Sequence, residues 1–221
     1  MSQNLPLPGL FLLMKLLILG ATGATGLQVV TQAVERGHTV TAFVRNVGRL
    51  EKFGDRIAVV RGNLLDSTEL GRVLAGQQAV LSAFGPRLPI SKADADLLQR
   101  FAVVLTDGMQ QAGVRRVVIE STAFLFKDAI FPPAHVFGRL FFPGIVRDAG
   151  EMEKIFEESG LDWTLVRPPQ LTDKPGTGKY RVLESHLPLF GFKIARADVA
   201  DFMIKASENH ASIRKIIGLA N

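Results

Sequence analysis

The sequence lacks cysteine altogether and has only four histidines, one tyrosine and one tryptophan among 221 residues. The absence of cysteine excludes disulfides, thiolate metal sites and cysteine nucleophiles. The histidines, at positions 38, 135, 186 and 210, do not have the spacing of zinc ligands, so we expect no metal site. The remaining candidates for function are backbone groups, hydroxyls and charged side chains.

Long apolar runs and clusters of like charge are also absent. Lys15 interrupts the longest apolar candidate, so no segment is expected to span a membrane. The net charge is +5, but the basic residues are spread along the chain and do not alternate with aromatic residues. We expect no nucleic-acid or membrane partner, a monomer or weak homodimer, and a basic surface that suits an anionic cofactor.

The first residues are interpreted as an extension. Residues 5–19 are apolar like a signal sequence, but they lack a charged start and run directly into the first predicted strand. Cleavage there would destroy that strand, so we expect a cytoplasmic protein. Residues 1–13 then form an N-terminal extension, and residues 14–221 form one domain that is long enough to bury a large core.

One stretch organises the chain: residues 14–26 read MKLLILGATGATG. The apolar run 15–19 is typical of a strand that is buried on both faces of a parallel sheet. Residues 27–36 carry apolar side chains at the spacing of one helix face. A strand, a glycine turn and a helix in this order predict that the N–H groups at the helix start hold a diphosphate.

The three glycines of this turn have different predicted tasks. Gly20 permits the tight turn, Gly23 leaves room for the diphosphate, and Gly26 lets the helix pack closely on the strand. The spacing is G-x-x-G-x-x-G, a variant seen in short-chain dehydrogenase/reductase relatives, rather than the usual G-x-G-x-x-G. The residues expected to contact the cofactor here are Gly20, Thr22, Gly23, Ala24, Thr25 and Gly26.

Strand and helix patterns alternate along the rest of the chain. They predict an α/β fold, a Rossmann-like doubly wound parallel sheet with helices on both faces, in a single domain. The predicted strands are 38–44, 57–61, 78–84, 116–120 and 163–167, and the predicted helices are 68–74, 93–112, 148–158 and 196–206.

The end of the second predicted strand indicates which dinucleotide binds. An acid there would accept the ribose hydroxyls of NAD, whereas a cation suits the 2′-phosphate of NADP. The sequence has Arg45 at this point and Arg49 one turn later, with no acid before Glu51. Because guanidinium donors match phosphate oxygens, we expect NADPH to be preferred over NADH. Either arginine is alternatively a surface charge.

Further cofactor contacts are expected where later strands end. Asn63 and Leu64 follow the third strand and are predicted to contact the adenine. At the end of the fourth strand, Ala83, Phe84 and Gly85 are expected to line the ribose and diphosphate. Arg87 is expected to reach a phosphate or a substrate anion.

Two hydroxyls follow the fifth strand. Ser121 and Thr122 are the candidate polar groups beside the nicotinamide, because chemistry in open α/β sheets gathers at the carboxyl ends of strands. The alternative is a turn in which these hydroxyls bond backbone groups.

A common acid–base pair is missing. Most short-chain dehydrogenases use a tyrosine with a lysine four residues later, but Tyr180 is the only tyrosine and residue 184 is glutamate. A planar conjugated acceptor, such as a flavin or a linear tetrapyrrole, suits this absence because it delocalises the charge that hydride brings.

Several motifs together resemble one family. They are residues 20–26, Val44-Arg45, STAFL at 121–125, ESGL at 158–161, RPP at 167–169 and DKPGTGKY at 173–180. From residue 15 to about residue 206 the chain is similar to the biliverdin reductase B/flavin reductase group of atypical, NmrA-like short-chain dehydrogenases/reductases.

The resemblance implies NAD(P)H-dependent reduction of FMN, FAD or another flavin, with biliverdin or a quinone as further acceptors stacked on the nicotinamide. The family serine that orients the nicotinamide falls on Thr122, and a histidine proposed as a substrate contact falls on Gln170. The double-proline motif adds Pro168 to the expected cofactor contacts. Two other readings remain open: a non-enzymatic NADP-sensing protein of the NmrA type and a sugar-nucleotide epimerase.

Two segments near the predicted site are ambiguous. Residues 124–142 hold six of the fifteen phenylalanines and are interpreted either as an apolar lid or as a satellite core or oligomer contact. Residues 174–180 form a glycine-punctuated loop that is expected to overhang the site.

Overall fold

The structure is a computed structural model that describes residues 13–86, 94–127 and 133–221. Eight strands form one sheet in the order β3-β2-β1-β4-β5-β6-β10-β8, and β7 pairs with β9 in a second, two-stranded sheet. Each pair of neighbours is parallel except β8 with β10. The strands are β1 (Lys15–Leu19), β2 (Thr39–Val44), β3 (Ala58–Arg61), β4 (Ala79–Ser82), β5 (Arg116–Glu120), β6 (Asp162–Arg167), β7 (Gln170–Thr172), β8 (Arg181–Glu184), β9 (Lys193–Ala195) and β10 (Lys215–Ala220).

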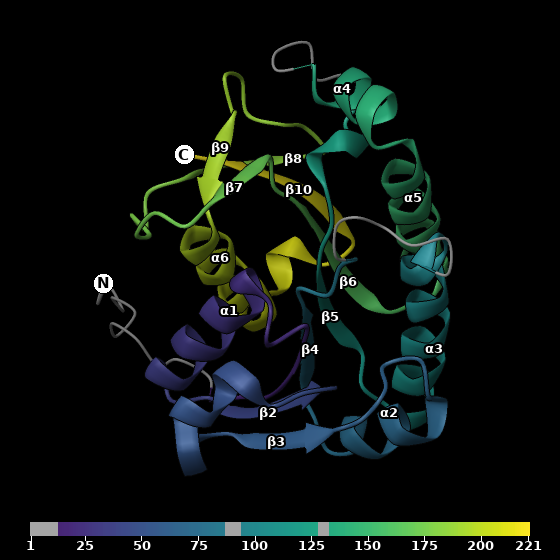
Figure 1. Cartoon of the computed structure of the whole chain (residues 1–221), viewed down its shortest axis with the longest axis vertical. Helices are drawn as coiled ribbons and strands as arrows, with labels where there is room; N and C mark the ends of the chain where they lie inside the picture. Colours follow the sequence, from purple (N-terminus) through teal and green to yellow (C-terminus); the bar gives the residue numbers. More distant parts are fainter. Residues whose placement is uncertain (1–12, 87–93, 128–132) are drawn as a thin grey trace, which may run out of the picture.

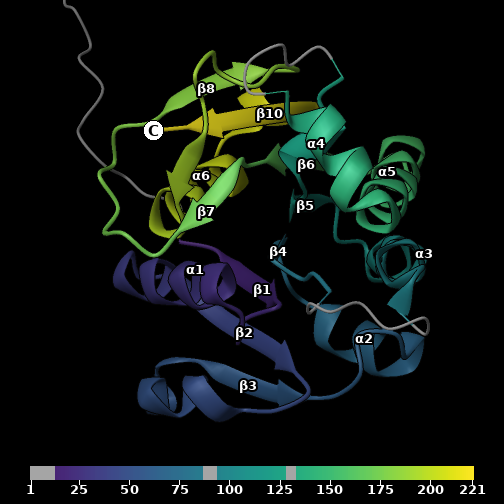
Figure 2. The same cartoon turned by 45° about the horizontal axis from the view of Figure 1, so that its top comes forward.

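Helices cover both faces of the large sheet. α1 and α6 lie together on one side, and α3 and α5 lie together on the other, where α2 also packs against α3 (Figure 1). The turned view places β2 and β3 at one end of the sheet and β8 and β10 at the other (Figure 2). The helices are α1 (Ala24–Glu35), α2 (Ser67–Leu74), α3 (Leu97–Ala112), α4 (Ala134–Phe141), α5 (Pro143–Glu158) and α6 (Arg196–Glu208), with short 3₁₀ segments η1 (Gly48–Arg56), η3 (Ala123–Leu125) and η4 (His210–Ser212). The predicted Rossmann-like fold is confirmed.

The unbroken apolar run of β1 follows from this layering. Leu16 and Ile18 point into the core beneath α1 and α6, whereas Leu17 and Leu19 point into the core beneath α3 and α5. Because successive side chains of a strand point to opposite faces, a strand with helices on both sides needs an apolar residue at every position. The sheet order also reverses between β1 and β4, which opens a crevice at their carboxyl ends.

Several predicted helix boundaries were wrong. α1 begins at Ala24 rather than 27, because the glycine turn itself forms the first helical turn. α3 begins at Leu97 rather than 93, and residue 93 lies outside the described residues. The Asp148 carboxylate accepts hydrogen bonds from the amides of Leu98 and Gln99, at 2.9 and 3.0 Å, so a group distant in sequence stabilises the start of α3.

The observed bounds of α5, β4 and α6 also differ from the predicted ones. α5 begins at Pro143 rather than 148, in keeping with the preference for proline in a first helical turn. The strand predicted over 78–84 ends at Ser82. α6 extends to Glu208, two residues beyond its predicted end. Its residues Val199 and Met203 are fully buried, and Phe202 is partly buried against the same core.

Four strands were not predicted. β7 and β9 have only three residues each, and β8 is exposed at all four positions. None of them therefore produces an apolar pattern in the sequence that would predict a buried strand. β10 is different, because it is largely buried and pairs with both β6 and β8. The sheet is therefore two strands wider than the sequence pattern indicated.

The phenylalanine-rich segment forms a satellite core in its described part. Phe126 and Ala134 are buried together with Leu187, which comes from the loop after β8. Phe124 stacks on Phe142 with ring centroids 5.7 Å apart. The structure thus supports the satellite-core interpretation, and residues 128–132 lie outside the described part.

The loop 174–180 is held away from the crevice. The Asp198 carboxylate of α6 accepts hydrogen bonds from the amides of Thr177 and Gly178, at 2.8 and 2.9 Å. None of residues 174–180 lines the large cavity described below. The expectation that this loop overhangs the site was therefore wrong.

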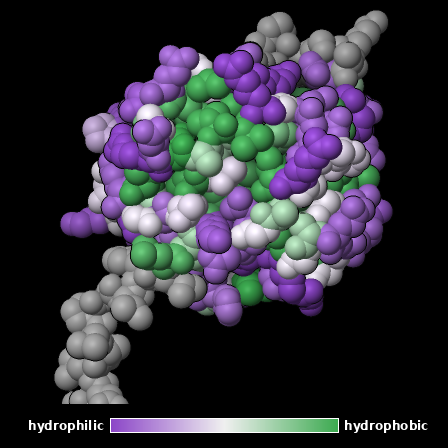
Figure 3. All heavy atoms as spheres, turned by 90° about the horizontal axis from the view of Figure 1, so that it is seen from below, coloured by the Kyte–Doolittle hydropathy of each residue, from purple (hydrophilic) through white to green (hydrophobic). Residues whose placement is uncertain are grey.

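The surface is polar with local apolar areas. Seen from below, hydrophilic side chains border a continuous hydrophobic area (Figure 3). No helix of the described ranges is long and apolar enough to cross a bilayer. Apolar side chains are thus not confined to the cores on the two faces of the sheet.

The close packing of the glycine turn gives a stability prediction. A Cβ at Gly26 would lie 2.1 Å from the backbone oxygen of Gly20, so Gly26→Ala should lower the free energy of unfolding by about 1–3 kcal/mol through overpacking. Urea denaturation measures this loss. Gly71→Ala in α2 is the matched control, because its Cβ would meet nothing within 4 Å and should stabilise the helix. Equal stability of Gly26→Ala and wild type would contradict the packing argument.

Candidate functional site

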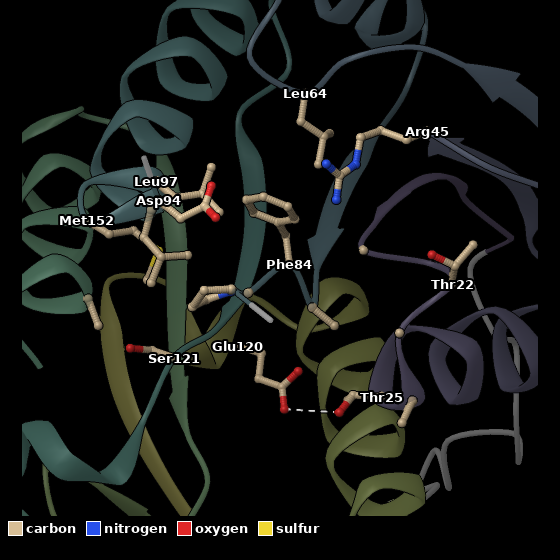
Figure 4. A pocket seen from close by; sticks show the side chains of 18 of the residues that line it. Thr22, Thr25, Arg45, Leu64, Phe84, Asp94, Leu97, Glu120, Ser121 and Met152 are labelled. Atoms are coloured by element: carbon tan, nitrogen blue, oxygen red, sulfur yellow. Dashed lines mark hydrogen bonds between the residues drawn. The ribbon is translucent and has the colours of Figure 1, made fainter. Parts of the chain in front are cut away.

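A cavity of about 870 Å³ lies where the carboxyl ends of the central strands meet. It is bordered by the glycine turn, by the ends of β2, β4 and β5, and by the beginnings of α3 and α6 (Figure 4). The predicted residues that line it are Gly20, Thr22, Gly23, Ala24, Thr25, Arg45, Asn63, Leu64, Ala83, Phe84, Gly85, Ser121 and Thr122. Most of the predicted site residues therefore line one continuous cavity.

The glycine turn has the geometry that an anion requires. Gly20 has φ +71°, and a Cβ there would lie 2.5 Å from the backbone oxygen of Ala83. The amide of Gly23 donates to the Gly20 oxygen at 2.9 Å and closes the turn. The first helical hydrogen bond of α1 is donated by Leu27, so the amides of the preceding turn have no helical acceptor.

Among the described residues, no side chain competes for these amides. The N-cap of α1 is Gly23, which makes no side-chain cap, and the first turn of α1 contains no acid. A Cβ at Gly23 would come within 3.1 Å of the Gly20 oxygen and would occupy the cavity wall. The residues present therefore fit a diphosphate bound at the start of α1.

One end of the cavity is basic. Arg45, at the end of the β2 strand, is exposed and extends beside Leu64 (Figure 4). Arg45 makes no ion pair with a described carboxylate. Asn63 lines the same end, and its Oδ1 accepts from the amide of Leu65 at 3.1 Å. This end suits the adenosine and 2′-phosphate of NADP.

The other end of the cavity has an apolar wall. Phe84 projects from the end of β4 into the middle of the cavity and packs against Phe101, with ring centroids 4.8 Å apart (Figure 4). The apolar residues on this side come from α3 and α5 and are Leu97, Leu98, Ile145, Ala149 and Met152. Such a wall suits a flat apolar ring system. Arg87, expected nearby, lies outside the described residues.

The two hydroxyls after β5 differ in their bonding. Thr122 Oγ1 accepts from the amide of Phe124 at 3.3 Å and caps η3, as the turn interpretation expected. Ser121 Oγ is buried and has no hydrogen-bond partner among the described residues. Ser121 points to the side of Met152 (Figure 4). Ser121 therefore lines the cavity, and its buried Oγ has an unused donor and acceptor.

Four predicted site residues do not line the cavity. Gly26 packs against the turn, and Arg49 lies exposed in η1. The Pro168 oxygen accepts from the amide of Ala123 at 3.1 Å, which anchors η3. Gln170 is exposed at the start of β7. The structure does not bring these four to the cavity wall.

The sequence analysis missed Glu120, the last residue of β5. Its Oε1 accepts from Thr25 Oγ1 at 3.2 Å, so it lies beside the start of α1 (Figure 4). Burial raises its pKa to about 7, while the Thr25 hydrogen bond and nearby Arg196 act in the opposite direction. An acid at the end of a buried apolar strand was the one signal in the sequence that pointed to it.

The raised pKa of Glu120 predicts a pH-dependent stability. The carboxyl titrates at about 7 in the fold and near 4.5 when exposed, so the fold binds this proton more tightly. The stabilisation that comes from protonated Glu120 is complete below about pH 4.5 and is lost as the pH rises through about 7. Glu120→Gln keeps a neutral acceptor for Thr25, so its stability relative to wild type should rise by about 1–3 kcal/mol from acid to mildly alkaline pH.

Thermal unfolding across this pH range tests the prediction. Glu35→Gln on the exposed end of α1 is the control and should show no such trend. Parallel pH profiles of stability for Glu120→Gln and wild type would contradict the raised pKa of Glu120.

The position of Arg45 predicts cofactor selectivity. Arg45→Asp should weaken NADPH binding by about 10- to 100-fold through the lost phosphate contact and change NADH binding little. Arg49→Asp, which makes the same charge change away from the cavity, is the control and should leave both affinities unchanged. Fluorescence titration measures the two affinities. Equal losses for NADPH and NADH would remove the phosphate assignment.

Known relatives share this sequence over most of its length. An uncharacterized chloroplastic protein of Arabidopsis thaliana is 31% identical over 212 residues, which cover 92% of this chain and 75% of that protein. A 3-diazoavenalumate denitrifying reductase of a Streptomyces species is 30% identical over 197 residues, which cover 80% of this chain and 64% of that protein.

Solved structures show the same fold. A short-chain dehydrogenase/reductase of Veillonella parvula in complex with NADP has a TM-score of 0.79 at 17% identity, covering 95% of each chain. The anaerobillin reductase ChuY of Escherichia coli O157:H7 has a TM-score of 0.77 at 21% identity, covering 93% of this chain and 96% of that one.

A family model described as NAD(P)H-binding matches residues 20–210, which include every described lining residue of the cavity. The narrower resemblance to the biliverdin reductase B/flavin reductase group stays a prediction. The chain therefore belongs to the NAD(P)H-binding family of Rossmann-like proteins.

Proposed function

We propose that this protein is an NADPH-dependent reductase that passes hydride to a flavin or a similar planar conjugated acceptor. Biliverdin and quinones belong to the same chemical class. The observation that carries the proposal is the apolar wall from α3 and α5, which adjoins a dinucleotide cavity that has no acid–base tyrosine. The names of the Streptomyces reductase and of ChuY support a reductase over the other members of the fold.

The position of Tyr180 supports this choice of acceptor. Its hydroxyl donates to Asp201 Oδ2 at 2.5 Å, and Tyr180 is not a lining residue of the cavity. Burial and the Asp201 carboxylate raise the pKa of Tyr180 above its ordinary value, so it is a poor proton donor or acceptor. The acceptor must then tolerate hydride without a tyrosine acid, as conjugated ring systems do.

The residues of the cavity have separate roles in this proposal. The amides and hydroxyls of the glycine turn bind the diphosphate, and Arg45 binds the 2′-phosphate. Bound nicotinamide supplies the hydride. Ser121 orients the nicotinamide end through its unused hydroxyl, and the apolar wall packs against one face of the acceptor ring. Solvent supplies the proton.

Anaerobic steady-state oxidation of NADPH tests the function with FMN, FAD, biliverdin and a soluble quinone as acceptors. At least one acceptor should be reduced, and Ser121→Ala should lower kcat by about tenfold through lost orientation. Tyr180→Phe is the control and should keep full turnover, because the proposal gives the phenol no role.

Two results would contradict the proposal. Tight NADPH binding with no turnover on any acceptor would indicate the NADP-sensing alternative. Purified protein that carries tightly retained NAD would indicate the epimerase alternative.

A further inference from the structure

Helix α4 presents an apolar face to solvent. Val136, Phe137, Leu140 and Phe141 are 66, 49, 72 and 59% exposed. With 3.6 residues per turn, these four positions form one continuous stripe along the helix. Figure 1 shows α4 at the top of the molecule, at the end opposite β3. We call these four residues the α4 stripe.

The adjoining face of α4 fixes the direction of the stripe, and Phe137 at the edge of the stripe also packs against Phe124, with ring centroids 6.0 Å apart. A Cβ at Gly138 would lie 2.6 Å from Phe124 Cβ, so the helix packs directly on η3. Ala134 is buried in the satellite core with Phe126. The stripe is therefore held outward by a packed helix.

A basic cavity adjoins the stripe. It has a volume of about 590 Å³ and contains four basic side chains and no acid among its lining residues, which are Leu125, Lys127, His135, Arg139, Pro143, Gly144, Val146 and Arg147. His135 and Arg139 come from α4 itself. Arg139 lies three positions after Val136 of the stripe, so these two residues are neighbours on the helix surface, whereas the His135 ring bonds the Phe124 backbone oxygen at 2.8 Å. Lys127, Arg139 and Arg147 make no ion pair with a described carboxylate.

We propose that the α4 stripe and the adjoining basic cavity dock the protein on an anionic lipid surface. A helix that lies in a membrane interface buries its apolar face among the acyl chains, while basic residues at its edge contact anionic headgroups. Both features are present on one short helix. From the sequence we expected no membrane partner, because no segment is long and apolar enough to span a bilayer, but an interfacial helix does not need to span one.

Charge complementarity favours a lipid surface over a second copy of the chain. A two-fold contact between two α4 stripes would bring the same basic edges of both copies into one interface, and the described lining of the basic cavity offers no carboxylate to pair them. A free phosphate would use the basic cavity but would leave the stripe exposed. An anionic membrane accounts for both the charge and the apolar side chains.

The proposal does not depend on the reductase function. The stripe and the four basic side chains are not lining residues of the cofactor cavity, although α5 borders both spaces through Ile145 and Val146. Variants of the docking surface should therefore bind NADPH as wild type does.

Flotation of the full chain with vesicles tests the proposal. The protein should float with vesicles of phosphatidylcholine and phosphatidylserine, remain unbound with phosphatidylcholine alone, and lose binding as salt is raised. Leu140→Ser/Phe141→Ser and Arg139→Gln/Arg147→Gln should each weaken binding by about tenfold or more.

Matched changes elsewhere on the surface provide the controls. Val103→Ser on α3 removes an exposed apolar side chain, and Arg61→Gln/Arg72→Gln removes two exposed charges distant from α4. Both should bind vesicles as wild type does. Circular dichroism and NADPH titration confirm that each variant is folded.

Three results would overturn the proposal. The first is no binding to phosphatidylserine vesicles at low salt. The second is full binding by Leu140→Ser/Phe141→Ser, because attraction by net charge alone would then explain it. The third is a dimer in sedimentation velocity that this same double variant dissociates, since a second copy would then be the occupant.

Discussion

The close contact between the glycine turn and the end of β4 is the constraint on which this structure depends. Gly20 adopts a positive φ directly against the backbone of Ala83, and Gly26 brings α1 onto the Gly20 oxygen. No side chain fits at either contact. Because the backbones meet here, the start of α1 and the end of β4 border one space, and the amides at the helix start remain available to an anion.

The cavity combines two environments: one suits the adenosine and 2′-phosphate of a pyridine nucleotide, and the other suits the nicotinamide with a flat acceptor. The end near β2 offers a guanidinium and polar groups, whereas the end near α5 is mainly apolar, with the Asp94 carboxylate beside Leu97 (Figure 4). Glu120 lies between them, next to the turn that would hold the diphosphate, and its raised pKa of about 7 leaves it partly protonated at neutral pH. A neutral carboxyl does not repel a bound diphosphate, whereas an ionised carboxyl would.

The sequence predicted the parts of the fold that depend on local pattern. β1, the glycine turn and the positions of Arg45, Phe84 and Ser121 at the cavity, just beyond the ends of β2, β4 and β5, follow from apolar periodicity and from the geometry of parallel sheets. The parts that were missed depend on contacts distant in sequence. Asp148 sets the start of α3 from another helix, β10 is defined by its pairing with β6 and β8, and Asp198 holds the 174–180 loop away from the site. Gln170 and Pro168 were placed by family motif, and the cavity does not include them.

The central claim is that the amides of the glycine turn and the guanidinium of Arg45 together bind NADPH. Isothermal titration calorimetry of NADPH and NADH into the intact protein tests it most directly. The account predicts one site per chain, with NADPH bound at least about tenfold more tightly than NADH. Failure of both nucleotides to bind would contradict the account, and tighter binding of NADH would contradict the role of Arg45.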